Sequence, residues 1–512
     1  STSSGTTDEA LDRQYRLHLA LVLVFLNTGL MIVDHIHFQY NGFLMGIFIF
    51  SIAHIRAGND LIGGILFAVL LNFKHIFLYV APLYFIHLLR RYCMGVVVVG
   101  TTTTTTAVIK ERGGGRGSFP LTSLYPPPPH RFRIDLSSYW SIDIGNLAVL
   151  GAGVVAVFAA SFGPFLFCRG NGSIDLEQIF QIFRRMFPFE GRGLCHAYWA
   201  PNIWALYNTC DKAMEVVMKR IPPNLLGSYG QSMMMMMMKM KEGEASNTTK
   251  GLVEAFVHSV LPKVDPKHTV ILTLLAMSPV LARTWTRPDP RNFAFSTGVC
   301  ALVAFLFGWH VHEKAILLAT LPLALSLIDV VVDDDDDDDD ASYNCNNDDE
   351  KTKRSTPTKT RMDGATTTTR RRRRRKELEI HAFWLLNIAG NASLLPLIHT
   401  PFEFPIKIGM LVAHTLVLQV MLEGMGAAWK KPKNKNKQQQ QQQQGSSKYS
   451  LSFSLSWWEL LYGLGLVGVQ LFQSVIHPIF FAHLAFLPLL LWSTYCAFGI
   501  VTAAVLYYFC LL

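Results

Sequence analysis

The sequence predicts an all-α fold, a polytopic bundle of about 12–13 transmembrane helices. Half of the 512 residues are hydrophobic and 16% are charged, a balance that argues against a water-soluble globule. Apolar runs recur along almost the whole chain. They lack the ten-residue alternation of an outer-membrane barrel, and backbone amides in lipid must be paired within their own segment, so we expect helical spans.

The expected spans are apolar runs of unequal length. A helix needs about 20 apolar residues to cross the hydrocarbon core, so we expect the shorter runs to be tilted or protected by neighbouring helices. The runs lie at about residues 17–33, 43–55, 61–73, 76–89, 143–167, 269–284, 293–309, 315–332, 378–397, 405–423, 456–474, 478–494 and 495–511.

Composition divides the chain into five segments. Two of them contain single-residue tracts that cannot form a packed core, such as Met233–Met238 and Asp333–Asp340. The segments are an N-terminal transmembrane catalytic module with luminal loops at 17–218, a low-complexity loop at 219–268, a transmembrane segment carrying VHEK at 269–332, a charged disordered loop at 333–377, and C-terminal transmembrane helices at 378–512.

The net charge of +9 gathers in the segments between apolar runs. We therefore expect no nucleic-acid partner and assign the basic ends to the cytosol by the positive-inside rule. This orientation places DHIHFQYNG on the opposite, luminal or extracellular, side. The basic positions are Arg90, Arg91, Lys110, Arg112, Arg116, Arg283, Arg287, Arg291 and Arg370–Arg375.

Four polar constellations lie at the predicted luminal ends of spans. Ionisable residues among apolar helices usually face a cavity or a partner, although each group could instead anchor a helix end at the headgroup layer. The constellations are DHIHFQYNG at 34–42, LNFKHIFLYVAP at 71–82, FPFEGRGLCHAYWAPN at 187–202 and FGWHVHEKAILL at 307–318.

The residue types in these constellations suit a sugar phosphate. Lys, Arg and His can bind phosphate, amides and aromatic rings suit sugar hydroxyls and faces, and a carboxylate can accept a hydroxyl proton. Transfer of a sugar from a lipid phosphate would use all of these residue types. A metal site at the two His-x-His pairs would require non-helical backbone, and a polytopic transporter would require internal repeats, which the two halves do not show.

The same stretches resemble a known family. DHIHFQYNG, LNFKHIFLYVAP, GLCHAYWAPNIWALYN and GWHVHEKAILL look like the signature segments of the endoplasmic-reticulum glucosyltransferases that use dolichyl-phosphate glucose, which have the multi-pass C-type glycosyltransferase fold. The resemblance covers most of the chain outside the low-complexity tracts. Ile36 and HAYWAPN favour the member that adds the second glucose over its sister that adds the first.

The resemblance implies an inverting transfer of glucose from dolichyl β-D-glucosyl phosphate to a monoglucosylated, dolichyl-diphosphate-linked oligosaccharide, with an α-1,3 linkage. It implies a multi-pass protein of the endoplasmic-reticulum membrane with a luminal active face. The family's presumed base is an aspartate in a first luminal loop resembling TLDYPP, and no such stretch precedes residue 17. We therefore expect an N-terminal part to be missing, and a non-catalytic fragment stays an alternative.

The resemblance also implies roles for individual residues. His312, Lys314 and Arg192 would hold the donor phosphate, and Lys74 would add a cation. Asp34 and Glu313 are the candidate bases, with helix capping or an ion pair to Lys314 as the alternative. No cofactor is predicted, and a divalent metal stays open. The predicted substrate-binding residues are His37, Gln39, Tyr40, Asn41, Lys74, Arg192, His196, Tyr198, Trp199, Asn202, His310, His312 and Lys314.

Overall fold

The computed structural model of the chain is helical throughout its described part, apart from one isolated β-bridge. The structure describes residues 14, 16–94, 142–166, 176–186, 193–195, 200–220, 258–332, 359–398, 401–428 and 454–511. Eight helices in this part are long and apolar enough to cross a membrane, and two shorter apolar helices accompany them. The predicted all-α polytopic fold is confirmed; the count of 12–13 spans stays a prediction.

The chain forms two compact units, each assembled from separate stretches. The first unit contains residues 1–39, 191–273 and 305–512, and the second contains 40–190 and 274–304. This division follows contacts in space, so it does not test the five segments predicted from composition.

The second unit is built on a hairpin of two short helices, α3 (Asn41–Arg56) and α4 (Asp60–Phe73). The turn between them contains Gly58 at φ +84°, a left-handed conformation that glycine adopts without steric cost. With about 1.5 Å per residue, α3 is about 24 Å long and α4 about 21 Å, less than the hydrocarbon core of about 30 Å. The hairpin brings the start of α3 to the end of α4.

A third segment closes the hairpin. After the 3-10 helix η3 (His75–Val80), α5 (Ala81–Leu88) and η4 (Leu89–Cys93) return along α4. The buried hydroxyl of Ser51 donates to the carbonyl of Gly63 at 2.7 Å and lies 3.0 Å from the hydroxyl of Tyr84. Because buried hydroxyls are costly without partners, this link fixes α3, α4 and α5 together.

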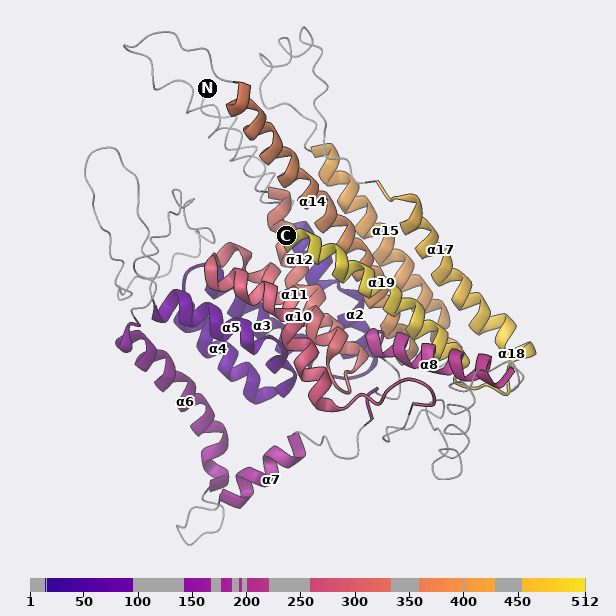
Figure 1. Cartoon of the computed structure of the whole chain (residues 1–512), viewed down its shortest axis with the longest axis horizontal. Helices are drawn as coiled ribbons and strands as arrows, with labels where there is room; N and C mark the ends of the chain where they lie inside the picture. The colour runs from indigo at the N-terminus through magenta and orange to yellow at the C-terminus, as the bar shows by residue number, and fades with distance from the viewer. Residues whose placement is uncertain are drawn as a thin grey trace, which may run out of the picture. The chain divides into compact units, whose positions relative to one another are not determined.

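The rest of the second unit comprises α6 (Ile144–Leu166), α7 (Leu176–Met186), the second half of α10 (Pro266–Thr286), η7 (Pro290–Asn292) and most of α11 (Phe293–Phe307). Helix α6 contacts α4, and α7 meets the end of α6 at an angle (Figure 1). No residue of α6 is buried, so its apolar surface fits a lipid environment.

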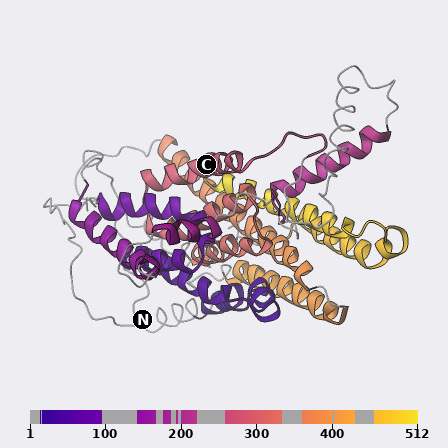
Figure 2. The ribbon, with the colours of Figure 1, turned by 90° about the horizontal axis from the view of Figure 1, so that it is seen from below.

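The first unit begins with a helix at Arg16–Ile36 that includes the π segments η1 (Leu21–Phe25) and η2 (Met31–Ile36) on either side of α2 (Thr28–Leu30). Its later elements are α8 (Ile203–Arg220), η8 (Glu313–Ile316), α12 (Leu317–Val332), α14 (Lys359–Leu394), η9 (Leu395–Leu397), η10 (Pro401–Glu403), α15 (Phe404–Ala428), α17 (Trp457–Leu471), η11 (Phe472–Ile476), α18 (His477–Phe480) and α19 (Leu487–Leu511). Of these, α14 lies beside α15 and α19, and α17 lies beside α19 (Figures 1 and 2).

Helix α14 is the centre of the first unit. The indole nitrogen of Trp492 on α19 donates to the carbonyl of Ala392 at 2.8 Å, and both side chains of this contact are buried. Asn387 accepts from Asn391 at 2.7 Å and lies 2.6 Å from a ring nitrogen of His414 on α15. Polar side chains within apolar helices are thus paired between elements, as a low-dielectric interior requires.

Two details differ from the sequence prediction. Helix α14 begins at Lys359, inside the segment 333–377 that was predicted as a charged loop, and the good helix propensity of Arg and Lys accounts for the extension. The predicted runs 478–494 and 495–511 are wrong as separate spans, because α19 continues from Leu487 to Leu511. Hydropathy alone does not mark where a continuous apolar stretch turns.

Candidate functional site

The VHEK motif of the first unit lies where the chain leaves one helix and enters another. Helix α11 ends at Phe307, and α12 starts at Leu317 after the short η8. His310 has φ +51°, a conformation uncommon outside glycine. His312 is extended, with φ −87° and ψ 147°. The backbone between the helices is therefore non-helical and presents neighbouring side chains in directions that a helix would not allow.

Hydrogen bonds join this loop to the segment Gly193–Cys195. The backbone N–H of His310 donates to the carbonyl of Leu194 at 3.0 Å, and Cys195 forms a parallel β-bridge with Val311. The His310 Nδ1 lies 2.9 Å from the carbonyl oxygen of Gly193. Since a carbonyl oxygen only accepts, Nδ1 carries the proton. Two of the four predicted constellations are thus brought together.

The start of α8 packs against the junction, which is the place where the VHEK loop meets Gly193–Cys195. The side-chain oxygen of Asn202 accepts from the N–H of Trp204 at 3.1 Å, and its amide donates to the carbonyl of Phe305 at 3.2 Å. The indole of Trp204 donates to the carbonyl of Gly308 at 3.0 Å. Asn202, a predicted sugar-binding residue, is buried and its amide is engaged with protein. Sequence reasoning missed Trp204, although it lies only two residues after Asn202.

Glu313 is the buried carboxylate of this region. Burial raises the pKa of Glu313, while its own backbone N–H, the ammonium of Lys314 and the ring of His37 act in the opposite direction. The influence of His37 means that DHIHFQYNG and VHEK lie close enough for their charges to interact. His312 and Lys314 are half-buried, and the rings of His310 and His312 are 5.8 Å apart.

The DHIHFQYNG stretch begins in the first unit as the last turn of its N-terminal helix. Asp34 is half-buried in η2, and His37 is exposed directly after it. Phe38 has φ +49° and is 89% exposed. A bulky residue in the left-handed region is a genuine outlier, and such strain is typical of functional segments. Sequence reasoning had not singled out Phe38.

The remainder of the motif belongs to the second unit, where it meets Lys74. The Lys74 ammonium donates to the side-chain oxygen of Asn41 at 2.6 Å and lies 5.7 Å from the centre of the Tyr40 ring. Lys74 has extended backbone between α4 and η3, so the helix break places the cation at the hairpin end. Lys74, Tyr40 and Asn41 are thus grouped within this unit, and their luminal location and site roles stay predictions.

Other predicted residues fall outside the described part. Arg192, His196, Tyr198 and Trp199 lie in undescribed stretches on either side of Gly193–Cys195. Among the described residues, no group of three or more His, Cys, Asp or Glu side chains could hold a metal ion. His310 already uses one ring nitrogen on the Gly193 carbonyl, and the question of a divalent metal stays open.

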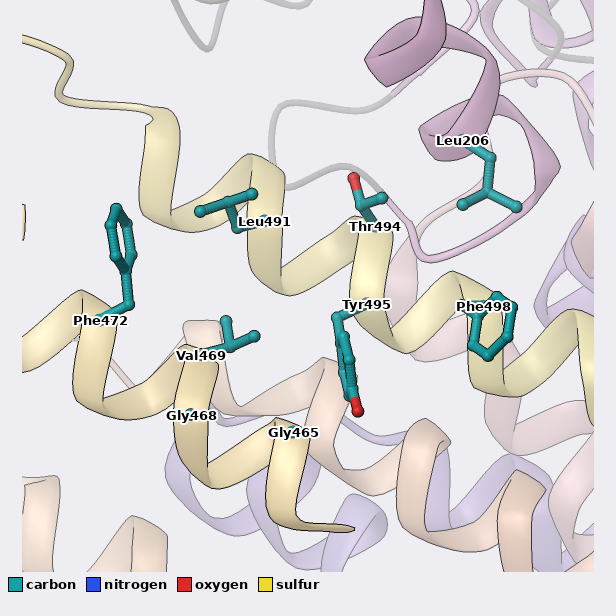
Figure 3. A pocket seen from close by; sticks show the side chains of 9 residues that line it. All are labelled: Leu206, Gly465, Gly468, Val469, Phe472, Leu491, Thr494, Tyr495 and Phe498. Carbon is teal, nitrogen blue, oxygen red and sulfur yellow. The ribbon is translucent and has the colours of Figure 1, made fainter. Parts of the chain in front are cut away.

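An apolar groove of about 610 Å³ lies beside the junction, within the first unit (Figure 3). It runs between α17 and α19, where Gly468 leaves open space on one side, Tyr495 packs directly over Gly465, and Leu491 and Phe498 lie on the other side. The lining residues are Leu206, Gly465, Gly468, Val469, Phe472, Leu491, Thr494, Tyr495 and Phe498.

The groove is continuous with the start of α8. The hydroxyls of Thr209 and Thr494 are 2.7 Å apart, which holds α8 against α19. Leu490, next to the groove residue Leu491, packs against the buried cluster of Leu194, Cys195 and Trp204. A long hydrocarbon chain in the groove would therefore end near the junction of the two motifs.

Comparison with known proteins gives this arrangement a family. The sequence profile described as "ALG6, ALG8 glycosyltransferase family" matches residues 3–334 and 368–507, which is most of the chain. The chain belongs to the ALG6, ALG8 glycosyltransferase family. The interval between the two matched parts lies within the charged segment 333–377, so the family core excludes that tract. Membership of this family, which the motifs predicted, is confirmed.

Relatives of this ALG6, ALG8 family chain have been named individually. The chain is 34% identical over 485 residues to an Arabidopsis thaliana protein, covering 94% of this chain and 71% of the relative. It is 34% identical to a Bos taurus protein and 32% identical to one of Coccidioides immitis, covering 94% of this chain in each case and 68% and 72% of the relatives. All three are named dolichyl pyrophosphate Glc1Man9GlcNAc2 alpha-1,3-glucosyltransferase.

Proposed function

We propose that this chain transfers glucose from dolichyl β-D-glucosyl phosphate to a monoglucosylated, dolichyl-diphosphate-linked high-mannose oligosaccharide, forming an α-1,3 linkage. The observation that carries the proposal is the pairing of Gly193–Cys195 with His310–Val311, which gathers two cation-bearing motifs of a glycosyltransferase family. The names of the relatives supply the acceptor, which already bears one glucose. The donor follows from the family resemblance of the motifs.

The cations act on the leaving group in this reaction. As the bond between glucose C1 and the phosphate oxygen breaks, negative charge grows on the phosphate, and Lys314, His312 and Arg192 stabilise it. Arg192 directly precedes Gly193 in the sequence, and its role here follows from the family resemblance alone. Lys74 contributes a further positive charge, held by Asn41.

The acceptor hydroxyl attacks C1 from the face opposite the departing phosphate, so a β-linked donor gives an α-linked product. The hydroxyl proton passes to a carboxylate, and dolichyl phosphate leaves with the electrons of the broken bond. Glu313 is one candidate base because a raised pKa favours proton uptake, and Asp34 is the other. His37, Gln39, Tyr40 and Asn202, with His196, Tyr198 and Trp199, supply sugar contacts. The groove between α17 and α19 accepts isoprenoid chain.

We place the protein in the endoplasmic-reticulum membrane as a multi-pass protein whose motifs face the lumen. The basic residues Arg56 and Arg91 lie at the end of the α3–α4 hairpin opposite Asn41 and Lys74, an arrangement that supports a cytosolic basic end. In this proposal the catalytic segments are 17–218 and 269–332, the low-complexity segments 219–268 and 333–377 take no part in catalysis, and 378–512 completes the helix bundle.

The test is restoration of lipid-linked oligosaccharide assembly. Microsomes lacking the endogenous activity receive this chain, and the pool is analysed for conversion of monoglucosylated to diglucosylated oligosaccharide. Lys314→Gln should reduce conversion by about tenfold or more, while Lys267→Gln, an exposed lysine outside the motifs, should leave it unchanged. Conversion of the unglucosylated species would indicate the sister reaction instead.

A parallel arm addresses the catalytic base. Glu313→Gln and Asp34→Asn are assayed beside the unchanged chain. A loss of conversion of about tenfold or more in one variant, with its unfolding temperature retained, would favour that carboxylate as the base. Retained conversion in both variants would exclude both carboxylates as the base, and inactivity of the unchanged chain would contradict the proposed transfer.

A further inference from the structure

A polar cavity lies in the second unit, at the opposite end from Lys74 and Asn41. It has a volume of about 190 Å³ and is closed by the end of α5, the end of α10, η7 and the start of α11. Polar and charged side chains dominate its wall, which is unusual among helices as apolar as these. The lining residues are His87, Arg283, Thr284, Arg287, Asp289, Asn292, Phe293 and Ser296.

His87 is the buried side chain at the base of this cavity. It is 1% exposed, and neither ring nitrogen has a hydrogen-bond partner among the described residues. The nearest carboxylate oxygen, Oδ1 of Asp60, lies 3.8 Å from Nε2, beyond hydrogen-bond distance. A buried ring with two unsatisfied nitrogens is costly, and such groups in folded proteins indicate an ion, a water or a ligand.

The charges on the cavity wall favour the binding of an anion over that of a cation. Two guanidinium groups, those of Arg283 and Arg287, contribute to its wall against one carboxylate, Asp289. Asp289 is already engaged, because it accepts from the backbone N–H of Arg291 at 2.9 Å and from the side-chain amide of Asn292 at 3.1 Å. These bonds leave Asp289 charged, so the wall carries two positive charges against one negative charge, together with neutral donors, a combination that suits phosphate.

Two further arginines lie at this end of the second unit. Arg91 pairs with Asp60 at 3.2 Å, and the guanidinium of Arg90 lies 5.9 Å from the centre of the Trp285 ring, which joins η4 to α10. By the positive-inside rule this end faces the cytosol, the side opposite the motifs of the candidate site. Anionic lipids are enriched in cytosolic leaflets and attract basic residues near the surface.

We propose that this cavity is a second anion site, which binds a phosphate group on the membrane face opposite the glucosyltransferase motifs. His87 donates an N–H from the buried base, and Arg283 and Arg287 bind the oxygens from the wall. A volume of about 190 Å³ holds roughly six water molecules, so a phosphate fits with part of its hydration. The group comes either from an anionic lipid headgroup or from free phosphate.

The test uses the full chain purified in detergent. Thermal unfolding is followed with inorganic phosphate and with chloride at equal ionic strength, and lipid adducts are measured by native mass spectrometry with phosphatidic acid or phosphatidylcholine. We expect phosphate or phosphatidic acid to raise the unfolding temperature. The double variant Arg283→Gln/Arg287→Gln should weaken the apparent affinity by about tenfold or more, since each charge-assisted bond contributes substantially.

The matched control is Arg291→Gln. Arg291 is exposed in the same loop and does not line the cavity, and glutamine retains the backbone N–H that Asp289 accepts. Stabilisation by both probes indicates a phosphate site open to free anions, and stabilisation by phosphatidic acid alone indicates a headgroup site. The proposal would be overturned if neither inorganic phosphate nor phosphatidic acid raised the unfolding temperature. It would also be overturned if the double variant and Arg291→Gln showed the same rise.

Discussion

The imidazole Nδ1 of His310 lies 2.9 Å from the carbonyl oxygen of Gly193. Over a hundred residues separate the two along the chain, and this contact with the adjacent β-bridge fixes the VHEK loop on the segment that follows Arg192. The conformation of the VHEK loop therefore depends on one histidine at positive φ.

Substitution of His310 tests this dependence. In His310→Ala the hydrogen bond is lost and alanine must adopt a left-handed conformation, which costs about 1–2 kcal/mol. We expect a lower unfolding temperature and at least a tenfold loss of glucosyl transfer. His310→Asn, which tolerates positive φ and retains a donor, should keep more of both. Equal activity of His310→Ala and the unchanged chain would show that the loop needs no such support.

The contact between Lys74 and Asn41 predicts an electrostatic effect. Asn41→Asp keeps the shape and strengthens the contact, but it cancels the charge that Lys74 offers to a phosphate. We expect a stable protein with a KM for the lipid-phosphate donor raised by several-fold. Asn41→Ala, measured alongside, should reduce stability instead. A donor KM unchanged by Asn41→Asp would remove Lys74 from the site.

Glu313 predicts a pH dependence of stability. Because burial raises its pKa above the ordinary value of 4.5, the fold favours the neutral carboxyl, and stability from this group is lost as pH rises from 4.5 through the raised pKa. Glu313→Gln removes this dependence. We expect the unfolding temperature of the variant, relative to the unchanged chain, to increase as the pH is raised from 4.5 to about 7.5. A constant difference across this range would contradict the burial argument.

The groove between α17 and α19 predicts a dependence on lipid length. Nothing lies within 4 Å of a Cβ placed at Gly468, so Gly468→Leu fills the groove without a backbone clash. We expect slower transfer with long-chain isoprenoid substrates and little change with short-chain analogues. Gly463→Leu is the control, because Gly463 has equal space and does not line the groove. Equal effects of the two variants would exclude the groove as a lipid site.

The sequence predicted the parts of this arrangement that depend on local pattern. Hydropathy predicted the apolar helices, and ionisable residues at their ends predicted a site that stays a prediction. It could not predict the bridge between Cys195 and Val311, because pairing between distant segments leaves no periodic signal. For the same reason Trp204 was missed, since its hydrogen bond to Gly308 depends on the packing of α8.

The positions of Asn202 and of the last span also depend on packing. A side-chain amide can bind a sugar or cap a helix, and the sequence does not distinguish the two roles. The Asn202 side chain caps α8 through the N–H of Trp204 and donates to the carbonyl of Phe305. Helix α19 continues through residue 495, where the sequence analysis had placed a boundary between two spans. Hydropathy does not show where a continuous apolar stretch turns, so this boundary could not be predicted correctly. Phe38 was not singled out from the sequence, because its special feature is a positive φ angle, which the sequence does not reveal.

The most direct measurement supplies the purified chain in proteoliposomes with labelled glucose donors and a monoglucosylated lipid-linked acceptor. The account predicts diglucosylated product from dolichyl β-D-glucosyl phosphate and none from a nucleotide-linked glucose, with Lys314→Gln reducing the rate and Lys267→Gln leaving it unchanged. Product formed equally well from the nucleotide sugar, or equally well by Lys314→Gln, would contradict a site built to hold a lipid phosphate.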